Sequence, residues 1–211
     1  MKTKFQLWFW LTTALFLPTT ILGAEGAAKV GIIKGSITIG GKPTTDAVVS
    51  VEGLPPEIFK SQLLNIKTKR GVMDQREMKF LPRLLPVLVG TTVEFPNNDK
   101  AWHNVFSPSE VKKFDLGLYT SGKSRSVTFD KAGVVKILCN VHPDMEAYVV
   151  VKEHPYYAAS DTRGNYRLNG VPLGKYRLEV WHPESGTRVV PFELVREGEV
   201  LGLDVDLKNQ K

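Results

Sequence analysis

Short apolar stretches alternate with turn-forming residues along most of the 211 positions of the chain. The stretches are rich in Val, Ile, Tyr and Phe, and Gly, Pro, Asn and Asp separate them, whereas sustained helical periodicity is absent after residue 24. Many short strands at this spacing are typical of a β-sandwich or barrel. We therefore predict an all-β fold with strands near residues 31–39, 47–52, 85–89, 91–96, 124–129, 134–138, 147–152, 156–160, 166–168, 175–182, 187–194 and 201–207.

Two interruptions of this rhythm predict domain boundaries. Residues 55–75 open with two prolines and continue through a mixed Lys, Gln and Leu segment, which favours a short helix or a mobile loop. Near residues 153–155 a proline ends the preceding strand, because proline cannot donate a hydrogen bond to a sheet. The chain thus divides into residues 29–54, 72–152 and 155–208.

Residues 1–24 have the order of a secretory signal peptide. Two lysines precede an apolar run over residues 5–22, and small residues follow at Gly23 and Ala24. A membrane anchor is the rival interpretation, because the run approaches spanning length, but threonines and Pro18 interrupt it. No cysteine lies near the junction to accept a bacterial lipid anchor. We expect cleavage after Ala24 and a periplasmic or secreted protein without a stable membrane anchor.

The charge distribution argues against nucleic acid as a partner. The formal net charge of the whole chain is +6, and residues 1–24 contain two lysines and no acid, so their removal leaves +4. The remaining Lys and Arg are scattered among acidic residues, whereas nucleic-acid-binding domains gather basic residues on one face. We expect no interaction with nucleic acid.

The cysteine content narrows the chemistry of the chain. Exported proteins normally use cysteines in pairs, because disulfides persist outside the cytoplasm. This chain has a single cysteine, Cys139, so a disulfide within it is impossible. The thiol is therefore an inert buried side chain, a link to another chain, a reactive nucleophile or a metal ligand. Its neighbours in the sequence favour the last of these.

A thiol, an imidazole and a thioether follow one another at three-residue intervals at Cys139, His142 and Met145. Well upstream, His103 follows the predicted strand at residues 91–96 and offers a second imidazole across the sandwich. Two His, one Cys and a weak axial Met make a soft, trigonal site suited to copper that cycles between Cu(II) and Cu(I). We predict one copper ion held by these four side chains.

With these residues in view, the chain over residues 72–152 resembles the cupredoxins, the blue-copper family that includes amicyanin, pseudoazurin and plastocyanin. The short interval between His142 and Met145 is most similar to amicyanin. The resemblance implies a Greek-key β-sandwich in which His103, Cys139 and His142 are equatorial ligands and Met145 is axial. It also implies that Asn104 pins the cysteine loop from outside the ligand shell.

The resemblance further implies electron transfer between a redox donor and a redox acceptor. Partners would dock where the ring edge of His142 reaches the surface, within an apolar collar of Trp102, Pro143 and Met145. In multicopper oxidases and copper nitrite reductases a His directly follows the cysteine, whereas Asn140 occupies that position here. We therefore expect an electron carrier and no enzyme activity.

Other chemistries remain open as alternatives. Zinc rarely takes a thioether ligand, so a zinc site is disfavoured. A cysteine nucleophile has a base within reach in His142, but no orienting Asn or Asp is evident and Met145 would have no role. A copper-binding or delivery protein without an electron-carrier role uses the same ligands. A carbohydrate-binding or adhesion β-protein with a vestigial copper loop is the third possibility.

The flanking residues 29–54 and 155–208 resemble two parts of a carboxypeptidase regulatory-like domain of the prealbumin type. The stretches at residues 160–168 and 171–180 carry this likeness, together with opening strands of the form found at residues 35–51. We predict that the copper unit is inserted in, or packed on, this second sandwich. The module suggests weak carbohydrate binding through Trp181 and Tyr157, although burial in the core is the alternative for both.

Four further side chains have ligand atoms but weaker context. His154 and His182 each precede a proline at a strand end, so we interpret them as structural or exposed. Met73 and Met78 lie in a polar stretch before the copper unit and offer thioethers to Cu(I), but two are too few to predict a carrier site.

Overall fold

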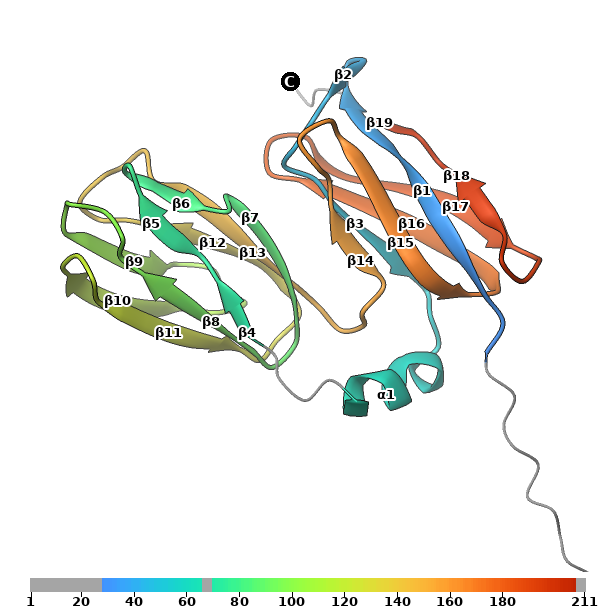
Figure 1. Ribbon diagram of the computed structural model, residues 1–211, viewed down its shortest axis with the longest axis horizontal. Coiled ribbons are helices and arrows are strands. Elements are labelled where there is room, and N and C mark those ends of the chain that lie inside the picture. Colours follow the sequence, from blue (N-terminus) through green and yellow to red (C-terminus); the bar gives the residue numbers. More distant parts are fainter. Residues whose placement is uncertain (1–27, 66–69, 208–211) are drawn as a thin grey trace, which may run out of the picture.

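The computed structural model describes residues 28–65 and 70–207, so the predicted signal peptide of residues 1–24 lies outside the described part. The described chain is nearly all-β, as predicted, and forms two β-sandwiches joined by one helix (Figure 1). Within the residues described, no helix is long and apolar enough to cross a membrane.

The flanking sandwich combines strands from both ends of the chain. Its first sheet is centred on β1, which pairs with strands from the C-terminal third, and β3 in the second sheet pairs likewise. The first sheet contains β1 (Val30–Ile39), β2 (Lys42–Pro43), β15 (Asn165–Pro172), β18 (Val200–Gly202) and β19 (Val205–Leu207), and the second contains β3 (Val48–Glu52), β14 (Tyr157–Ala159), β16 (Gly174–His182) and β17 (Gly186–Leu194).

The central sandwich is built from residues 70–152 and lies between those two parts of the sequence (Figure 1). Its sheets have the strand orders β10-β9-β12-β13-β7 and β11-β8-β4, and β5-β6 forms a separate hairpin. The strands are β4 (Arg70–Val72), β5 (Asp74–Arg76), β6 (Lys79–Leu81), β7 (Leu84–Leu88), β8 (Thr91–Pro96), β9 (His103–Ser107), β10 (Phe114–Tyr119), β11 (Ser124–Phe129), β12 (Gly133–Leu138) and β13 (Glu146–Lys152).

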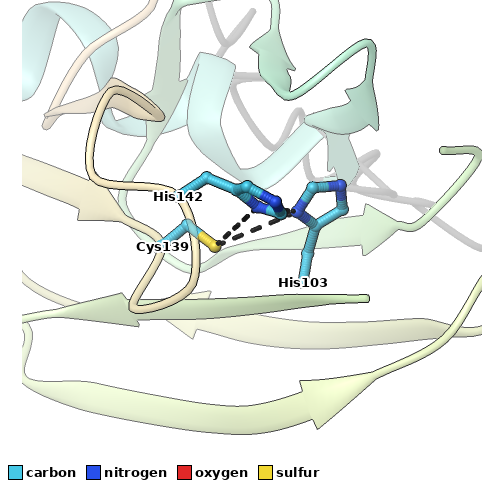
Figure 2. A group of neighbouring side chains, drawn as sticks. All are labelled: His103, Cys139 and His142. Carbon is cyan, nitrogen blue, oxygen red and sulfur yellow. Dashed lines mark hydrogen bonds between the residues drawn. The ribbon is translucent and has the colours of Figure 1, made fainter. Parts of the chain in front are cut away.

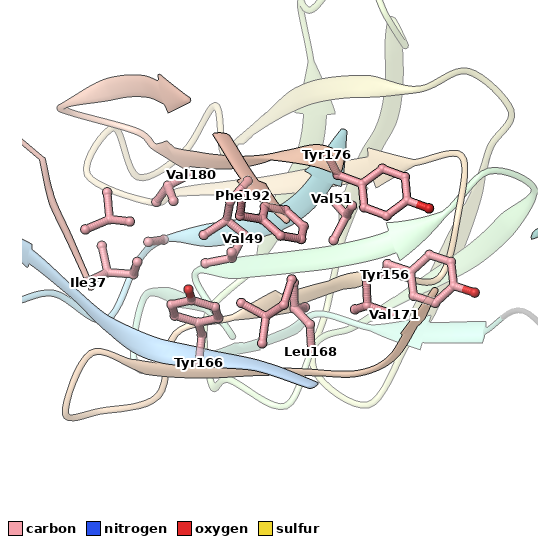
Figure 3. Close-up of a cluster of buried hydrophobic side chains, with 14 of the residues drawn as sticks. Ile37, Val49, Val51, Tyr156, Tyr166, Leu168, Val171, Tyr176, Val180 and Phe192 are labelled. Carbon is pink, nitrogen blue, oxygen red and sulfur yellow. The ribbon is translucent and has the colours of Figure 1, made fainter. Parts of the chain in front are cut away.

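Side-chain alternation explains how each sandwich forms its core. Along β8, Val93 and Phe95 are buried while the residues between them are partly exposed, which is the period of two that places alternate side chains on opposite faces. They pack with Phe129 and Ile137 in one core that spans both sheets. The flanking sandwich has its own core, in which aliphatic and aromatic side chains from both sheets meet (Figure 3).

A helix connects the two sandwiches on the N-terminal side. Of the two alternatives predicted for residues 55–75, the structure has a helix, α1 (Pro56–Asn65). Pro56 suits its first position because the missing N–H is not needed there, and Glu57 in the first turn complements the helix dipole. Phe59 packs its ring against His154, with ring centroids 5.6 Å apart.

The two sandwiches meet along an interface that we call the seam, formed by β7 and β13 on one side and β3 and β16 on the other. Val150 turns away from the central core and is buried with Leu84 and Val48. Tyr148 and Trp181 lie edge to face with ring centroids 5.3 Å apart. Burial of this third apolar cluster fixes the outer face of the central sheet against the flanking sandwich.

Ion pairs reinforce the seam. Arg83 contacts Asp46 at 2.7 Å and Glu184 at 3.4 Å, and both acids belong to the flanking sandwich. On the other side, Lys152 contacts Glu52 at 3.1 Å and Glu179 at 2.8 Å. The pairs of Arg83 with Asp46 and of Lys152 with its two acids are only partly exposed, so they are screened less than surface pairs and favour one relative orientation of the sandwiches, whereas Glu184 is 72% exposed.

The structure also contains strands that the pattern did not predict. These are β2, the short strands β4 to β6, and both β9 and β10. The strand predicted at residues 201–207 is two short strands, β18 and β19, each pairing with β1. Between them, the carbonyl of Leu203 would lie 1.9 Å from a Cβ at Gly35, so only glycine permits this approach of the backbones.

Candidate metal centre

Three of the predicted ligands converge at one end of the central sandwich (Figure 2). His103 is the first residue of β9, Cys139 follows β12, and His142 lies in the loop that leads to β13. Sγ of Cys139 lies 3.9 Å from Nδ1 of His103 and 3.9 Å from Nδ1 of His142. The two Nδ1 atoms are 3.1 Å apart. Among the described residues, this is the one group of His, Cys, Asp or Glu side chains found at metal-ligand spacing.

The spacing of these three atoms fits a single metal ion. With edges of 3.1, 3.9 and 3.9 Å, the point equidistant from the three atoms lies in their plane, about 2.1 Å from each, and metal bonds to imidazole nitrogen and thiolate are about 2.0–2.3 Å long. No side chain needs to move for all three to reach one ion. A planar set of one thiolate and two imidazoles is the donor set that suits copper.

The sequence of the loop explains how His142 is presented. The backbone N–H of Met145 donates to the carbonyl of His142 at 3.0 Å, which closes a four-residue turn. Pro143 occupies the second position of this turn, where its fixed φ is favourable. His142 therefore stays close to Cys139, and its side chain is half-buried while His103 is 0% exposed.

Met145 is the last residue of the turn that begins at His142. Its side chain is 1% exposed and belongs to the central core together with Cys139. It therefore does not contribute to the apolar collar considered from the sequence, because its side chain is buried in the central core. Its role as the axial ligand stays a prediction; the structure shows only that Met145 belongs to the same core cluster as Cys139.

Asn104 lies next to the cysteine loop. Its Oδ1 faces the backbone N–H of Asn140 at a long 3.4 Å, and its Nδ2 donates to Oδ1 of Asp115 at 2.6 Å. Asp115 in turn accepts from the N–H of Gly117 at 2.7 Å. The side chain therefore bridges β9, β10 and the loop after β12, which holds the cysteine loop to the rest of the sandwich.

Asp99 is a site residue that sequence reasoning missed. Its Oδ2 lies 3.0 Å from Nε2 of His103, on the side of the ring opposite Cys139. A hydrogen bond from the backbone N–H of Met78, with help from His103 and the N–H of Lys100, lowers the pKa of the Asp99 carboxyl to about 2. The carboxylate is therefore ionised at neutral pH. The only signal in the sequence is an acid four residues before the histidine.

The remaining candidates lie away from this cluster. His154 and His182 are buried in the flanking half of the molecule, and neither belongs to the metal cluster. Met73 is buried in the central core, whereas Met78 is exposed at the turn between β5 and β6. Trp181 contacts Tyr148 in the seam, so its ring is already partly covered by the protein.

Together these features define a class: a β-sandwich domain with one mononuclear metal site formed by a thiolate and two imidazoles. Residues 66–152 match the family model of copper binding proteins of the plastocyanin/azurin family. This part of the chain is therefore a cupredoxin domain, and copper is the metal of that family. The match covers less than half of the chain and includes no strand of the flanking sandwich. No curated protein matches the chain.

Several solved structures are similar to the same part of the chain. A purple cupredoxin from Nitrosopumilus maritimus is 24% identical with a TM-score of 0.37, and the match covers 39% of this chain and 99% of that one. The reduced state of an amicyanin mutant is 32% identical over 39% and 82% of the two chains, with a TM-score of 0.37. A copper-containing nitrite reductase from Thermus scotoductus is 26% identical over 41% and 23%, with a TM-score of 0.39.

Proposed function

We propose that the protein is an electron carrier in which one copper ion, held by His103, Cys139, His142 and Met145, cycles between Cu(II) and Cu(I). The observation that carries this proposal is the convergence of two Nδ1 atoms and one Sγ on a single point in a buried setting. Bound copper supplies the one-electron couple. The protein supplies ligands whose positions are already fixed before the metal arrives.

Rigidity of the ligands is what suits the site to electron transfer. His103 and Cys139 extend from strands of one sheet, and the turn at Pro143 fixes His142 against them. Both copper states then share nearly the same ligand geometry, so little reorganisation accompanies the change of charge. Thiolate and thioether donors favour Cu(I), while imidazoles accommodate both states.

Redox partners would dock where His142 reaches the surface. Trp102 is 55% exposed and Val141 is 47% exposed, and both are chain neighbours of ligands. Pro143 is also exposed. An apolar surface of this kind beside a half-buried ligand brings a partner close to the copper while allowing rapid dissociation. We propose separate donor and acceptor proteins that use this surface in turn.

We place this carrier in the periplasm or outside the cell, on the basis of the signal-peptide pattern over residues 1–24. We expect no substrate turnover. The residue after the ligand cysteine is Asn140, so a direct histidine connection to a second metal site is missing at this position. The flanking sandwich serves in this proposal as a platform, with weak carbohydrate binding as an additional hypothesis.

The visible and paramagnetic-resonance spectra of the purified, copper-loaded protein test the proposal. An intense thiolate-to-copper band, lost in Cys139→Ser and retained in the neighbouring loop variant Val141→Ala, is the expected result. A colourless Cu(I) complex that exchanges quickly with chelators would indicate copper delivery instead. Absence of stoichiometric copper together with measurable glycan affinity would indicate a carbohydrate-binding protein.

A further inference from the structure

We propose that Asp99 is a positioning residue of the copper site, which fixes the ring of His103 and stabilises Cu(II) relative to Cu(I), thereby lowering the reduction potential. This inference rests on the proposed function. The residue donates no atom to the metal and lies in the loop between β8 and β9.

The geometry at His103 gives the imidazole one tautomer. Nδ1 faces Sγ of Cys139 and Nδ1 of His142, so it is the ligand atom and carries no proton in the metal-bound form. Nε2 then carries the ring proton and donates it to Oδ2 of Asp99 at 3.0 Å. A carboxylate that accepts from the distal nitrogen of a ligand histidine fixes the ring orientation and raises its basicity.

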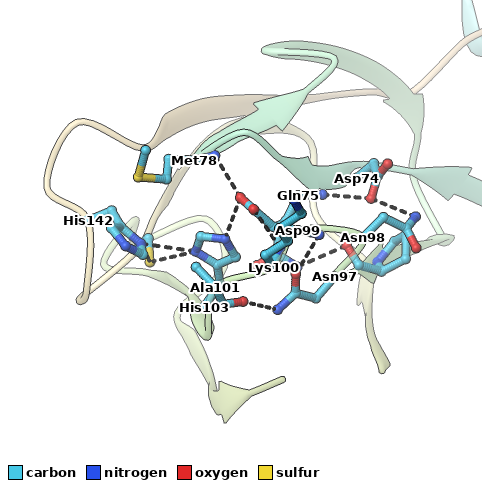
Figure 4. Close-up of polar contacts among 12 residues, drawn as sticks. Asp74, Gln75, Met78, Asn97, Asn98, Asp99, Lys100, Ala101, His103 and His142 are labelled. Carbon is cyan, nitrogen blue, oxygen red and sulfur yellow. Dashed lines mark hydrogen bonds and ion pairs between the residues drawn. The ribbon is translucent and has the colours of Figure 1, made fainter. Parts of the chain in front are cut away.

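The carboxylate of Asp99 is itself held in place by the loop around it (Figure 4). The backbone N–H of Asp99 donates to Oδ1 of Asn97 at 3.0 Å, and Oδ1 of Asp99 accepts from the backbone N–H of Lys100 at 2.7 Å. Nδ2 of Asn97 donates to the carbonyls of Ala101 and Tyr119, at 3.0 and 3.1 Å. The loop is therefore a closed set of hydrogen bonds that keeps Oδ2 directed at His103.

The turn of the β5-β6 hairpin adds a second support to the same oxygen. Oδ2 of Asp99 also accepts from the backbone N–H of Met78 at 2.7 Å. Glu77 and Met78 have φ values of 52° and 54°, the left-handed pair of a two-residue hairpin turn, which non-glycine residues adopt at a cost. Asn98 accompanies this contact by donating its N–H to the carbonyl of Gln75 at 3.0 Å.

Burial strengthens the electrostatic interaction between Asp99 and His103. The side chain of Asp99 is 13% exposed and that of His103 is 0% exposed, so solvent screens their interaction far less than it would at the surface. A fixed negative charge on the far side of a ligand ring stabilises the more highly charged metal ion more strongly. The carboxylate therefore shifts the copper couple towards Cu(II).

Asp99→Asn tests the charge because it keeps the shape and a carbonyl oxygen acceptor. We expect a blue protein whose preference for Cu(II) over Cu(I) falls about tenfold, which raises the potential by about 59 mV for one electron. Asp99→Ala, which removes the acceptor as well, should lower Cu(II) affinity about 10- to 100-fold. The matched control is Asp74→Asn, which removes a charge from the same hairpin network without touching a ligand.

A measurement on the metal-free protein provides an independent readout. Nitrogen NMR of the His103 ring should show a slowly exchanging Nε2–H, which Asp99→Ala exposes to rapid exchange and Asp74→Asn leaves protected. A blue protein whose potential is the same in Asp99→Asn and Asp74→Asn would overturn the inference and leave the proposed function intact. Failure of the unaltered protein to form any thiolate-copper complex would overturn both.

Discussion

Each half of the molecule buries histidines, but the two halves use them in opposite ways. In the central sandwich, Nδ1 of His103 and Nδ1 of His142 face each other and the thiol of Cys139. In the flanking half, Nδ1 of His182 accepts the backbone N–H groups of two following residues at 3.2 Å, and Nδ1 of His154 accepts another at 3.3 Å. Three of the four rings are buried and that of His142 is half-buried, whereas convergence is restricted to the pair in the central sandwich.

This difference shows what marks a metal site in a β-sandwich. A buried polar group needs a partner, and the local backbone supplies partners to His154 and His182 within a turn. At the other site two ring nitrogens and a sulfur face one another, and among the described residues no backbone N–H donates to these nitrogens. A single cation between them would be coordinated by all three atoms at once.

Removing one histidine ring at a time is the strongest test of this difference between the two halves. We expect His103→Ala or His142→Ala to lower copper affinity by more than about 100-fold, beyond the effect of outer-shell changes, and to abolish the blue band. His154→Ala and His182→Ala are the matched changes in the flanking half and should leave affinity and spectrum unaltered. Copper titration monitored by visible absorption measures all four. Equal losses from both pairs would refute the distinction.

A second test separates stability from chemistry at the seam. Leu84→Ala removes a buried side chain between the sandwiches, where Val48 and Val150 contact the same cluster. We expect a loss of about 2–4 kcal/mol in the free energy of unfolding, as is usual for buried Leu→Ala changes. Chemical denaturation of the metal-free protein measures it, with the exposed Leu118→Ala as the control.

The copper spectrum should stay the same in Leu84→Ala, because Leu84 packs in the seam cluster and not in the central core that contains Cys139 and Met145. A weakened blue band would instead mean that the flanking sandwich supports the ligand geometry through the seam. In that case the ion pairs of Arg83 with Asp46 and Glu184 would be the first contacts to examine.

Strict alternation accounts for the strands that could be predicted from sequence. The strand at residues 91–96 was predicted with its observed bounds because buried and partly exposed positions alternate along it without a break. In β9, by contrast, His103, Asn104 and Val105 are buried in succession, so the period of two is lost. In β10 the register shifts between Asp115 and Leu118, which again removes the signal. Both strands are irregular where they approach the metal centre.

The candidate ligands could be predicted from the sequence for a different reason. Cys139, His142 and Met145 are three residues apart, so a single loop brings their side chains together. Asp99 reaches His103 only after the loop of residues 97–101 has folded on itself and the β5-β6 turn has met it. Contacts that depend on such distant partners leave no local pattern, and the same holds for the pairing of Arg83 with Asp46.

Met145 provides a further test within the central site, because its role as a ligand is still a prediction. We expect Met145→Leu, which nearly conserves volume, to keep the blue band and to shift the reduction potential, because a weak donor to copper is removed. The change corresponds to about a tenfold shift in the ratio of Cu(II) to Cu(I) affinity. Voltammetry measures it, and Met73→Leu, in the same core, is the control.

An unchanged potential in Met145→Leu would remove the thioether from the ligand set. The buried position of Met145 would then be explained by packing alone, and the site would be a three-coordinate centre of His103, Cys139 and His142.

The smallest expected effect lies in the pH dependence of the flanking half. Burial lowers the pKa of His154 below its ordinary value of 6.5, although Glu52 opposes the shift. The unfolded chain therefore binds more protons in the interval below pH 6.5, and this contribution to stability is complete above that pH and is lost as the pH falls towards the lowered pKa. Urea denaturation of the metal-free protein between pH 7.5 and 5.5 should show this loss, and His154→Gln should make it less steep. If stability falls with pH equally steeply in His154→Gln and in the unaltered protein, the ring of His154 becomes protonated without disturbing its contact with Phe59. The flanking half then uses this buried histidine for packing and does not require it to stay neutral.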